Sequence, residues 1–262
     1  MKVVTSLAND TVKAVRALHL RKAREESGLF LAEGLKIVTE AVDLGFSPAI
    51  LMHGVKAGGQ PALARAAAVA RETIEVTPAI LAKISRRDNP QTVLGVFEQR
   101  LTPLTDLKRE RVVVALEEVR DPGNLGTIIR TADAAGCGGV ILIGETCDPY
   151  SVEAVRATMG SIFAVPIARA SNSDFLAFRA DWPGAVIGTH LAATTDFRAA
   201  PYRPASVILF GAEQAGLSDE LAAACDAMVK IPMRGRADSL NLAVAAGVMI
   251  YAATGALESS AP

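Results

Sequence analysis

The sequence has 262 residues, of which 50% are hydrophobic and 21% charged, and its formal net charge is −1. This composition supports a sizeable core in one large domain or two modest ones and excludes wholesale disorder. Without a signal-peptide core or an apolar run of membrane-spanning length, the chain is expected to be cytoplasmic. Its three cysteines are an odd number without metal-type spacing, so we expect reduced thiols, no disulfide framework and no metal site.

Positive charge gathers at the start of the chain, where residues 1–24 contain six basic side chains and one acidic one, Asp10. Such a cluster is able to contact phosphates, although charge alone is more often explained by a solvated helix face. Asn9 and Asp10 offer N-cap chemistry for a helix that runs through this cluster to a stop at Gly28.

The rest of the first hundred residues alternates between strand-like and helical patterns. Strands are predicted at 29–31, 49–52, 74–76 and 92–97, and helices at 35–44, 61–71 and from Pro78. The segment 100–111 combines Pro103 with mixed charges and weak periodicity, which places a domain boundary there. We therefore expect one α/β domain over 1–102 and a second domain over 103–262.

The second half repeats the alternation with more strongly apolar strands. These are predicted at 112–116, 140–143, 185–187, 207–210 and 228–231, with helices at 126–135, 152–163, 218–224 and 239–254. Continuous apolar runs are typical of strands that are buried on both faces of a parallel sheet. Ligands of such a sheet bind beyond the carboxyl ends of its strands.

The first predicted strand of this half is followed by the loop 117–126. Two glycines and a proline favour a tight turn into a helix, with Arg130 about one turn inside it. This arrangement suits an anion held by a helix N-terminus and an arginine, but an ordinary turn with a surface arginine fits equally well. The Gly-x-x-Gly spacing is not a dinucleotide fingerprint, and the chain has no P-loop.

Two further loops follow later strands. In 210–218, Gly211 and Gly216 allow the backbone to approach a ligand, Glu213 is able to accept hydrogen bonds, and Ser218 is placed to cap a helix, although a merely structural turn fits as well. In 231–241, Asp238 or Ser239 is expected to cap the last helix. Asn241 would then lie in the first turn of this helix. Capping by Asp238 or Ser239 does not explain its presence there, because asparagine is a modest helix former.

Taken together and in this order, the three loops resemble the motifs of the SpoU (TrmH-like) branch of the SPOUT RNA methyltransferases. The matching residues are Asn124-Leu125-Gly126 with Arg130-Thr131-Ala132, Gly211-Ala212-Glu213 with Gly216-Leu217, and Ile231-Pro232-Met233 with Ser239-Leu240-Asn241. The resemblance covers about 111–256 and includes 155–161, which precedes a strand at 165–166. It departs at Leu242-Ala243, where relatives often have Val-Ser, and at Gly123, where they often have a larger residue.

The start of the chain is similar to the N-terminal substrate-binding domain of many relatives, through Arg21-Lys22-Ala23-Arg24 and Phe30-Leu31-Ala32-Glu33-Gly34. The resemblance implies a small α/β RNA-binding domain like a ribosomal protein, followed by a larger parallel-sheet domain with a trefoil knot. It also changes the interpretation of the basic cluster, which we now expect to bind RNA through Arg16, Arg21, Lys22 and Arg24.

The same resemblance implies methyl transfer from S-adenosylmethionine to a ribose 2′-hydroxyl. Arg130 is expected to clamp the reacting ribose and its phosphate, because a guanidinium with a pKa of roughly 12 or more is a poor base. Asn124, Glu213, Ser239 and Asn241 are expected to orient the reactants. The expected cofactor contacts are Gly188, Thr189, Gly211, Ile231, Met233 and Leu240. Members of this family usually form homodimers through the last helix.

The resemblance leaves the substrate and some alternatives open. The separate N-terminal domain favours ribosomal RNA, most readily 23S, over transfer RNA. A non-catalytic RNA-binding module is disfavoured because Asn124, Arg130, Glu213 and Asn241 are all present. A dinucleotide-dependent oxidoreductase is disfavoured by the missing fingerprint.

Overall fold

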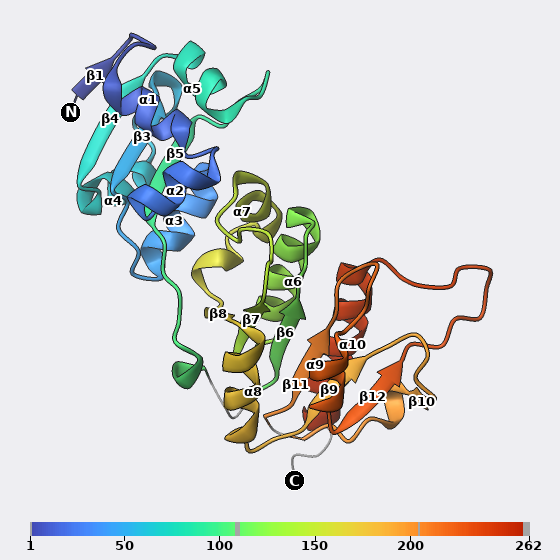
Figure 1. Ribbon diagram of the computed structural model, residues 1–262. Helices are drawn as coiled ribbons and strands as arrows, with labels where there is room; N and C mark the ends of the chain where they lie inside the picture. Colours follow the sequence, from blue (N-terminus) through green and yellow to red (C-terminus); the bar gives the residue numbers. More distant parts are fainter. Residues whose placement is uncertain (1, 108–110, 204, 259–262) are drawn as a thin grey trace. The chain divides into compact units, whose positions relative to one another are not determined.

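The computed structural model describes residues 2–107, 111–203 and 205–258 (Figure 1), so part of the predicted boundary at 100–111 lies outside the described residues. The chain divides into two compact units. Unit 1 contains Met1–Gln99 and Asp148–Ala164, and unit 2 contains Arg100–Cys147 and Val165–Pro262. The predicted domains were contiguous, whereas the structure groups 148–164 with the first unit.

Unit 1 is built on a five-stranded mixed sheet in the order β1-β4-β3-β5-β2. Its strands are β1 (Lys2–Val4), β2 (Leu29–Glu33), β3 (Ile50–Gly54), β4 (Glu72–Val76) and β5 (Val93–Glu98). Strand β5 runs antiparallel to both β2 and β3, while β1, β4 and β3 are parallel. Strand β1 was not predicted; the other four lie where the sequence indicated.

The helices of unit 1 before residue 100 are α1 (Asp10–Ala17), α2 (Arg21–Ser27), α3 (Leu35–Asp43), α4 (Pro61–Val69) and α5 (Pro78–Ser85), with a 3₁₀ turn at Val55–Ala57. The single helix predicted between Asn9 and Gly28 is wrong. Asn9 caps α1 as expected, but the helix ends at Ala17 because Leu18 turns into the core. Gly28 ends α2 with a left-handed φ of 67°, which favours glycine.

The segment 148–164 completes the core of unit 1. It contains α7 (Val152–Thr158) and a 3₁₀ turn at Ser161–Phe163, and Val152 is buried in the same apolar cluster as Leu31 and Ile74. Tyr150 packs on Phe30 with ring centroids 4.8 Å apart, and Phe163 packs on Phe97 at the same distance. Aromatic pairs at this separation stabilise a core beyond simple burial of area.

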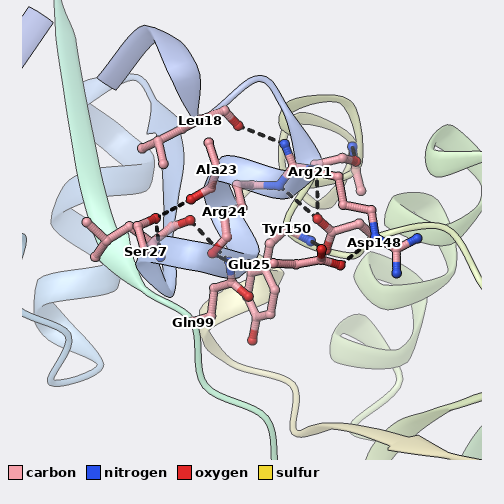
Figure 2. A network of polar contacts seen from close by, with 12 residues as sticks. Leu18, Arg21, Ala23, Arg24, Glu25, Ser27, Gln99, Asp148 and Tyr150 are labelled. Atoms are coloured by element: carbon pink, nitrogen blue, oxygen red, sulfur yellow. Dashed lines mark hydrogen bonds and ion pairs between the residues drawn. The ribbon is translucent and has the colours of Figure 1, made fainter. Parts of the chain in front are cut away.

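Two ion pairs also hold this segment in unit 1. Arg24 pairs with Asp148 at 2.7 Å, and their side chains are 4% and 11% exposed. Arg24 also donates to the carbonyl of Leu18 at 2.7 Å (Figure 2). Arg156 donates two hydrogen bonds to Glu33, at 3.1 and 2.7 Å. A buried ion pair with satisfied hydrogen bonds fixes the arrangement of its segments, because removal of either partner leaves an unpaired charge.

Unit 2 contains a fully parallel seven-stranded sheet in the order β10-β12-β9-β11-β6-β7-β8. The strands are β6 (Val113–Glu117), β7 (Gly139–Ile143), β8 (Ile167–Ala170), β9 (Val186–Thr189), β10 (Thr195–Asp196), β11 (Val207–Phe210) and β12 (Ala227–Lys230). The predicted parallel α/β sheet is confirmed. Its central strands are buried along their whole length, as the apolar runs indicated.

The helices of unit 2 are α6 (Pro122–Ala134), α8 (Asn172–Ala180), α9 (Asp219–Ala223) and α10 (Leu242–Glu258), with 3₁₀ turns at Leu104–Asp106 and Phe197–Ala199. Helix α8 and strand β10 were not predicted. Helix α10 packs against α6, which brings the last helix of the chain beside the helix that follows β6. None of the described helices has both the length and the apolar composition needed to cross a membrane.

Candidate active site

The three loops that resemble family motifs meet at one edge of the unit 2 sheet. They follow β6, β11 and β12, and the sheet order places β11 beside β6, with β9 between β11 and β12. All these strands are parallel, so their carboxyl ends share the same edge, which is where ligands bind in open α/β sheets. The three loops are far apart in the sequence, but the order of the strands in the sheet makes them neighbours.

A cavity of about 470 Å³ lies among these loops, within the range of roughly 300–1,000 Å³ usual for small-molecule sites. Five of the six predicted cofactor residues line it: Thr189, Gly211, Ile231, Met233 and Leu240. Glu213, Ser239 and Asn241 also line it, as does His190, which the sequence did not single out. The feature that could have identified His190 as a cavity residue is its position directly after the end of β9.

The sixth predicted cofactor residue, Gly188, does not line the cavity. A Cβ atom at Gly188 would lie 2.5 Å from Met228 Sδ and 2.7 Å from Cys225 Sγ. Close packing inside the unit therefore favours glycine here, and the cofactor contact at Gly188 stays a prediction. The next residue, Thr189, is the one that reaches the cavity.

Gly211 and Gly216 shape the loop after β11. A Cβ atom at Gly211 would lie 2.0 Å from the carbonyl carbon of Gly216, so only glycine fits. Ala212 and Gly216 exchange two backbone hydrogen bonds of 3.1 and 2.9 Å, and Gly216 has a left-handed φ of 71°. The loop is thus a closed turn, and its residues 210–216 line the cavity.

One residue from each motif forms a chain of hydrogen bonds. Asn241 Nδ2 donates to Asn124 Oδ1 at 2.9 Å, and Asn124 Nδ2 donates to Glu213 Oε1 at 3.3 Å. We call these three side chains the amide relay. The amide relay gives a structural reason for the presence of Asn124, Glu213 and Asn241 in the three motifs, because each side chain orients the next one at the edge where the motif loops meet.

Asn241 also caps the last helix, which corrects the predicted capping by Asp238 or Ser239. Its Oδ1 accepts from the backbone N–H groups of Ala243 and Val244, at 2.9 and 3.3 Å, and α10 begins at Leu242. One amide side chain therefore satisfies the helix N-terminus with its oxygen and the relay with its nitrogen. Ser239 is instead an exposed residue at the cavity.

A buried carboxylate that the sequence analysis passed over links the first two loops. Glu117, at the end of β6, is 6% exposed, and its Oε2 accepts from the backbone N–H of Ser218 at 2.8 Å. Ser218 caps α9, as predicted, by accepting from Leu221 N. The available signal was an acidic residue ending an otherwise apolar strand, a position that requires a hydrogen-bond partner when buried.

Arg130 lies apart from the amide relay. It is exposed on α6 and forms no hydrogen bond or ion pair with any residue that the structure describes. Asn124 and Arg130 are six residues apart, so at 3.6 residues per turn their side chains point about 120° apart around the helix. The structure therefore places Glu213, Ser239 and Asn241 at the cavity and joins Asn124 to two of them, and it leaves the Arg130 guanidinium without a partner among the described residues.

The four residues that were predicted to contact RNA differ in their exposure and in the ion pairs that they already form. Arg24 is buried against Asp148 (Figure 2), so we withdraw it from the RNA-binding residues. Arg21 and Lys22 are exposed, but they form ion pairs with Glu25 and Glu26 one turn later on α2. Arg16 is half-buried in the last turn of α1. Lys2 and Lys13 also form ion pairs, so four of the six basic side chains are partly neutralised, and Arg24 is structural.

Comparison with known proteins gives the site its context. The SpoU rRNA Methylase family model matches residues 111–251, and the MRM3-like substrate binding domain model matches residues 9–95. The 23S rRNA (guanosine(2553)-2′-O)-methyltransferase RlmP of Bacillus subtilis is 30% identical over 96% of this chain and 98% of its own. The 23S rRNA (uridine(2479)-2′-O)-methyltransferase of Streptomyces viridochromogenes is 32% identical over 89% and 85%.

Solved structures agree. An AdoMet-bound rRNA methyltransferase from Sinorhizobium meliloti superimposes with a TM-score of 0.92 at 50% identity, covering 98% of both chains. The SpoU methyltransferase AviRb from Streptomyces viridochromogenes, in complex with AdoMet, superimposes with a TM-score of 0.86 at 29% identity, covering 97% of this chain and 100% of that one. The parallel sheet and the cavity at its carboxyl edge define an α/β ligand-binding domain joined to a second α/β unit. The chain belongs to the SpoU rRNA methylase family.

Proposed function

We propose that this protein transfers a methyl group from S-adenosylmethionine to a ribose 2′-hydroxyl of 23S ribosomal RNA. The observation that carries the proposal is the cavity at the carboxyl edge of the unit 2 sheet, where the amide relay joins all three family motifs. The names of the relatives support it: two are 23S rRNA 2′-O-methyltransferases, and structural neighbours hold AdoMet.

The residues present fit the methyl donor. Gly211 and Gly216 shape the closed turn after β11, which we call the backbone cradle and which a Cβ atom at Gly211 would disrupt. This turn lines the cavity, and Ile231, Met233 and Leu240 also line it and offer apolar side chains. The donor supplies an electrophilic methyl group on a sulfonium. The protein's part is to hold the donor and the ribose in line, and this ordering is itself a large contribution to rate.

The remaining side chains divide that work. Glu213 and Asn241 are fixed by the relay at the cavity, where they orient bound groups. Arg130, exposed and free of partners among the described residues, clamps the ribose and its phosphate and stabilises negative charge on the reacting oxygen. Arg130 acts by its positive charge, and the proton of the 2′-hydroxyl is released to water.

The first test is of the reaction itself. Purified protein, labelled S-adenosylmethionine and in vitro transcribed 23S rRNA are expected to give label in RNA, resistant to alkaline hydrolysis at one nucleotide. Bulk transfer RNA in a parallel reaction is expected to give none. Transfer to transfer RNA alone would overturn the ribosomal substrate, and binding of NAD without methyl transfer would favour an oxidoreductase instead.

The second test separates chemistry from cofactor binding. Arg130→Ala is expected to abolish methyl transfer, because the developing charge loses its stabilising partner, while S-adenosylmethionine affinity measured by calorimetry stays within about twofold. Arg120→Ala is the matched control, since Arg120 is also an exposed arginine, in the loop that leads into the helix of Arg130, but pairs with Glu118. Loss of cofactor affinity in Arg130→Ala would refute this division of roles.

Three expectations from the family resemblance stay predictions. The first is the trefoil knot, and the second is a cytoplasmic location. The third is a homodimer through the last helix, which is supported by apolar side chains that α10 leaves exposed, Val244 at 53% and Tyr251 at 56%. Exposed apolar surface of this kind on one helix face is typical of an interaction site.

A further inference from the structure

Two side chains from other parts of unit 1 contact the C-terminal end of α5. The ring Nε2–H of His19, which follows α1, donates to the carbonyl of Ile84 at 2.6 Å. Arg156 of α7 donates to the carbonyl of Ser85 at 2.8 Å. Arg86 and Arg87 come next in the chain. A helix C-terminus carries partial negative charge that cations usually neutralise, and here His19 and Arg156 already occupy its carbonyl groups.

Arg86 and Arg87 are left without partners. Both are exposed, and neither forms an ion pair or hydrogen bond with any described residue. Arg86 ends the helix with a left-handed φ of 54°. Other exposed arginines of unit 1 are paired: Arg65 with Asp43 at 3.1 Å and Arg71 with Glu98 at 2.6 Å. The pair at the end of α5 therefore stands out as uncompensated charge.

The surroundings reinforce the positive potential. Lys83 is exposed on the last turn of α5. The carboxylate of Glu33 is already paired with Arg156. The acidic residue that directly follows Arg87 in the sequence is Asp88, which is exposed. Burial lowers the pKa of His19 below its ordinary value, and the nearby charges of Arg86 and Arg156 lower it further. The hydrogen bond to Ile84 and the carboxylate of Glu33 raise this pKa, but their effect is the smaller one. We call Lys83, Arg86 and Arg87 the α5 basic end.

We propose that the α5 basic end is a docking surface for the sugar–phosphate backbone of RNA, with Arg86 and Arg87 each binding a phosphate. This inference rests on the proposed function for its partner. Arginine favours phosphate over other anions because its planar fork matches two phosphate oxygens. Arg86 and Arg87 are adjacent at the end of α5, so two phosphates of one RNA strand are within their reach. Phosphate contacts of this kind set the position of RNA without reading its sequence.

The test compares two double variants of the full chain that remove equal charge from unit 1. Arg86→Gln/Arg87→Gln removes the proposed contacts, and Arg65→Gln/Arg71→Gln removes two exposed but paired arginines. Affinity for in vitro transcribed 23S rRNA is measured by filter binding over a series of salt concentrations. Cofactor affinity and the thermal midpoint report on the fold.

Arg86→Gln/Arg87→Gln is expected to weaken RNA binding by about tenfold for each guanidinium and to reduce the slope of log affinity against log salt by about two. In methyl transfer, KM for RNA rises while kcat at saturating RNA and cofactor affinity stay unchanged. The control pair is expected to keep the wild-type slope. The inference is overturned if the two variants behave alike, or if wild-type binding to the transcript shows no salt dependence. Salt-dependent binding through Arg86 and Arg87 without methyl transfer would overturn the proposed function and leave this surface standing.

Discussion

Asn124 is the middle of the amide relay, since it accepts from Asn241 and donates to Glu213. Asn124→Ala removes both hydrogen bonds, so we expect kcat to fall by about tenfold or more, at about 1 kcal/mol for each bond. Thr127→Ala, on the same helix, is the control, because its hydroxyl bonds only the carbonyl of Gly123. Equal losses in the two variants would argue against a role for the relay in methyl transfer.

The thiols of buried Cys137 and half-buried Cys225 are expected to resist alkylation. Burial raises the pKa of the Cys137 thiol to about 12, and burial together with Asp226 raises that of Cys225 to about 11. At pH 7.5 less than about one thiol in a thousand is then ionised, and labelling is expected to speed up with rising pH. Mass spectrometry after iodoacetamide treatment measures this, with urea-unfolded protein as the control. Fast labelling of Cys225 in the native protein at pH 7.5 would contradict the expectation.

At the residue scale, motif resemblance pointed to many of the residues that line the cavity but not to the hydrogen bonds among them. Asn124, Glu213 and Asn241 were all expected to be functional, yet their mutual hydrogen bonds join residues up to 117 positions apart. Arg24 looked like a surface cation because its partner, Asp148, lies 124 positions away. Spacing along a chain predicts helix neighbours well, but it carries no information on such distant pairs.

At the scale of elements, the loop after β11 depends on glycine. Gly211→Ala is expected to displace the loop and abolish cofactor binding, because the new methyl group would overlap the backbone of Gly216. Gly235→Ala is the matched control in another loop near the site, where nothing lies within 4 Å of the added atom. Calorimetric titration with S-adenosylmethionine measures both variants. Normal affinity in Gly211→Ala would show that the cradle is not part of the cofactor site.

Most elements were predictable because their apolar periodicity is strong, as in β6, β7 and β11. Helix α8 was missed although Ser171 and Asp174 form a capping box at its start. The break between α1 and α2 was missed because its cause is tertiary. Leu18 is buried, and His19 bonds to a carbonyl of α5, and neither partner is visible in local sequence.

At the scale of the whole molecule, one ion pair supports the discontinuous unit 1. Asp148→Ala leaves the buried guanidinium of Arg24 without a counter-charge, and we expect a loss of about 3–5 kcal/mol in the free energy of unfolding. Asp43→Ala breaks the exposed pair with Arg65 and is expected to cost less than about 1 kcal/mol. Hydrogen exchange of unit 1 amides measures both. Similar protection in the two variants would contradict a structural role for the buried pair.

The grouping of residues 148–164 with unit 1 has a consequence for synthesis. A ribosome releases the N-terminus first, but Val152 and Phe163 belong to the interior of the unit that begins at the N-terminus. At roughly 5–20 residues per second, the first 99 residues wait several seconds for these side chains. During that interval the nascent chain exposes Phe30 and Phe97. We therefore expect chaperones to bind the nascent chain at this stage of translation.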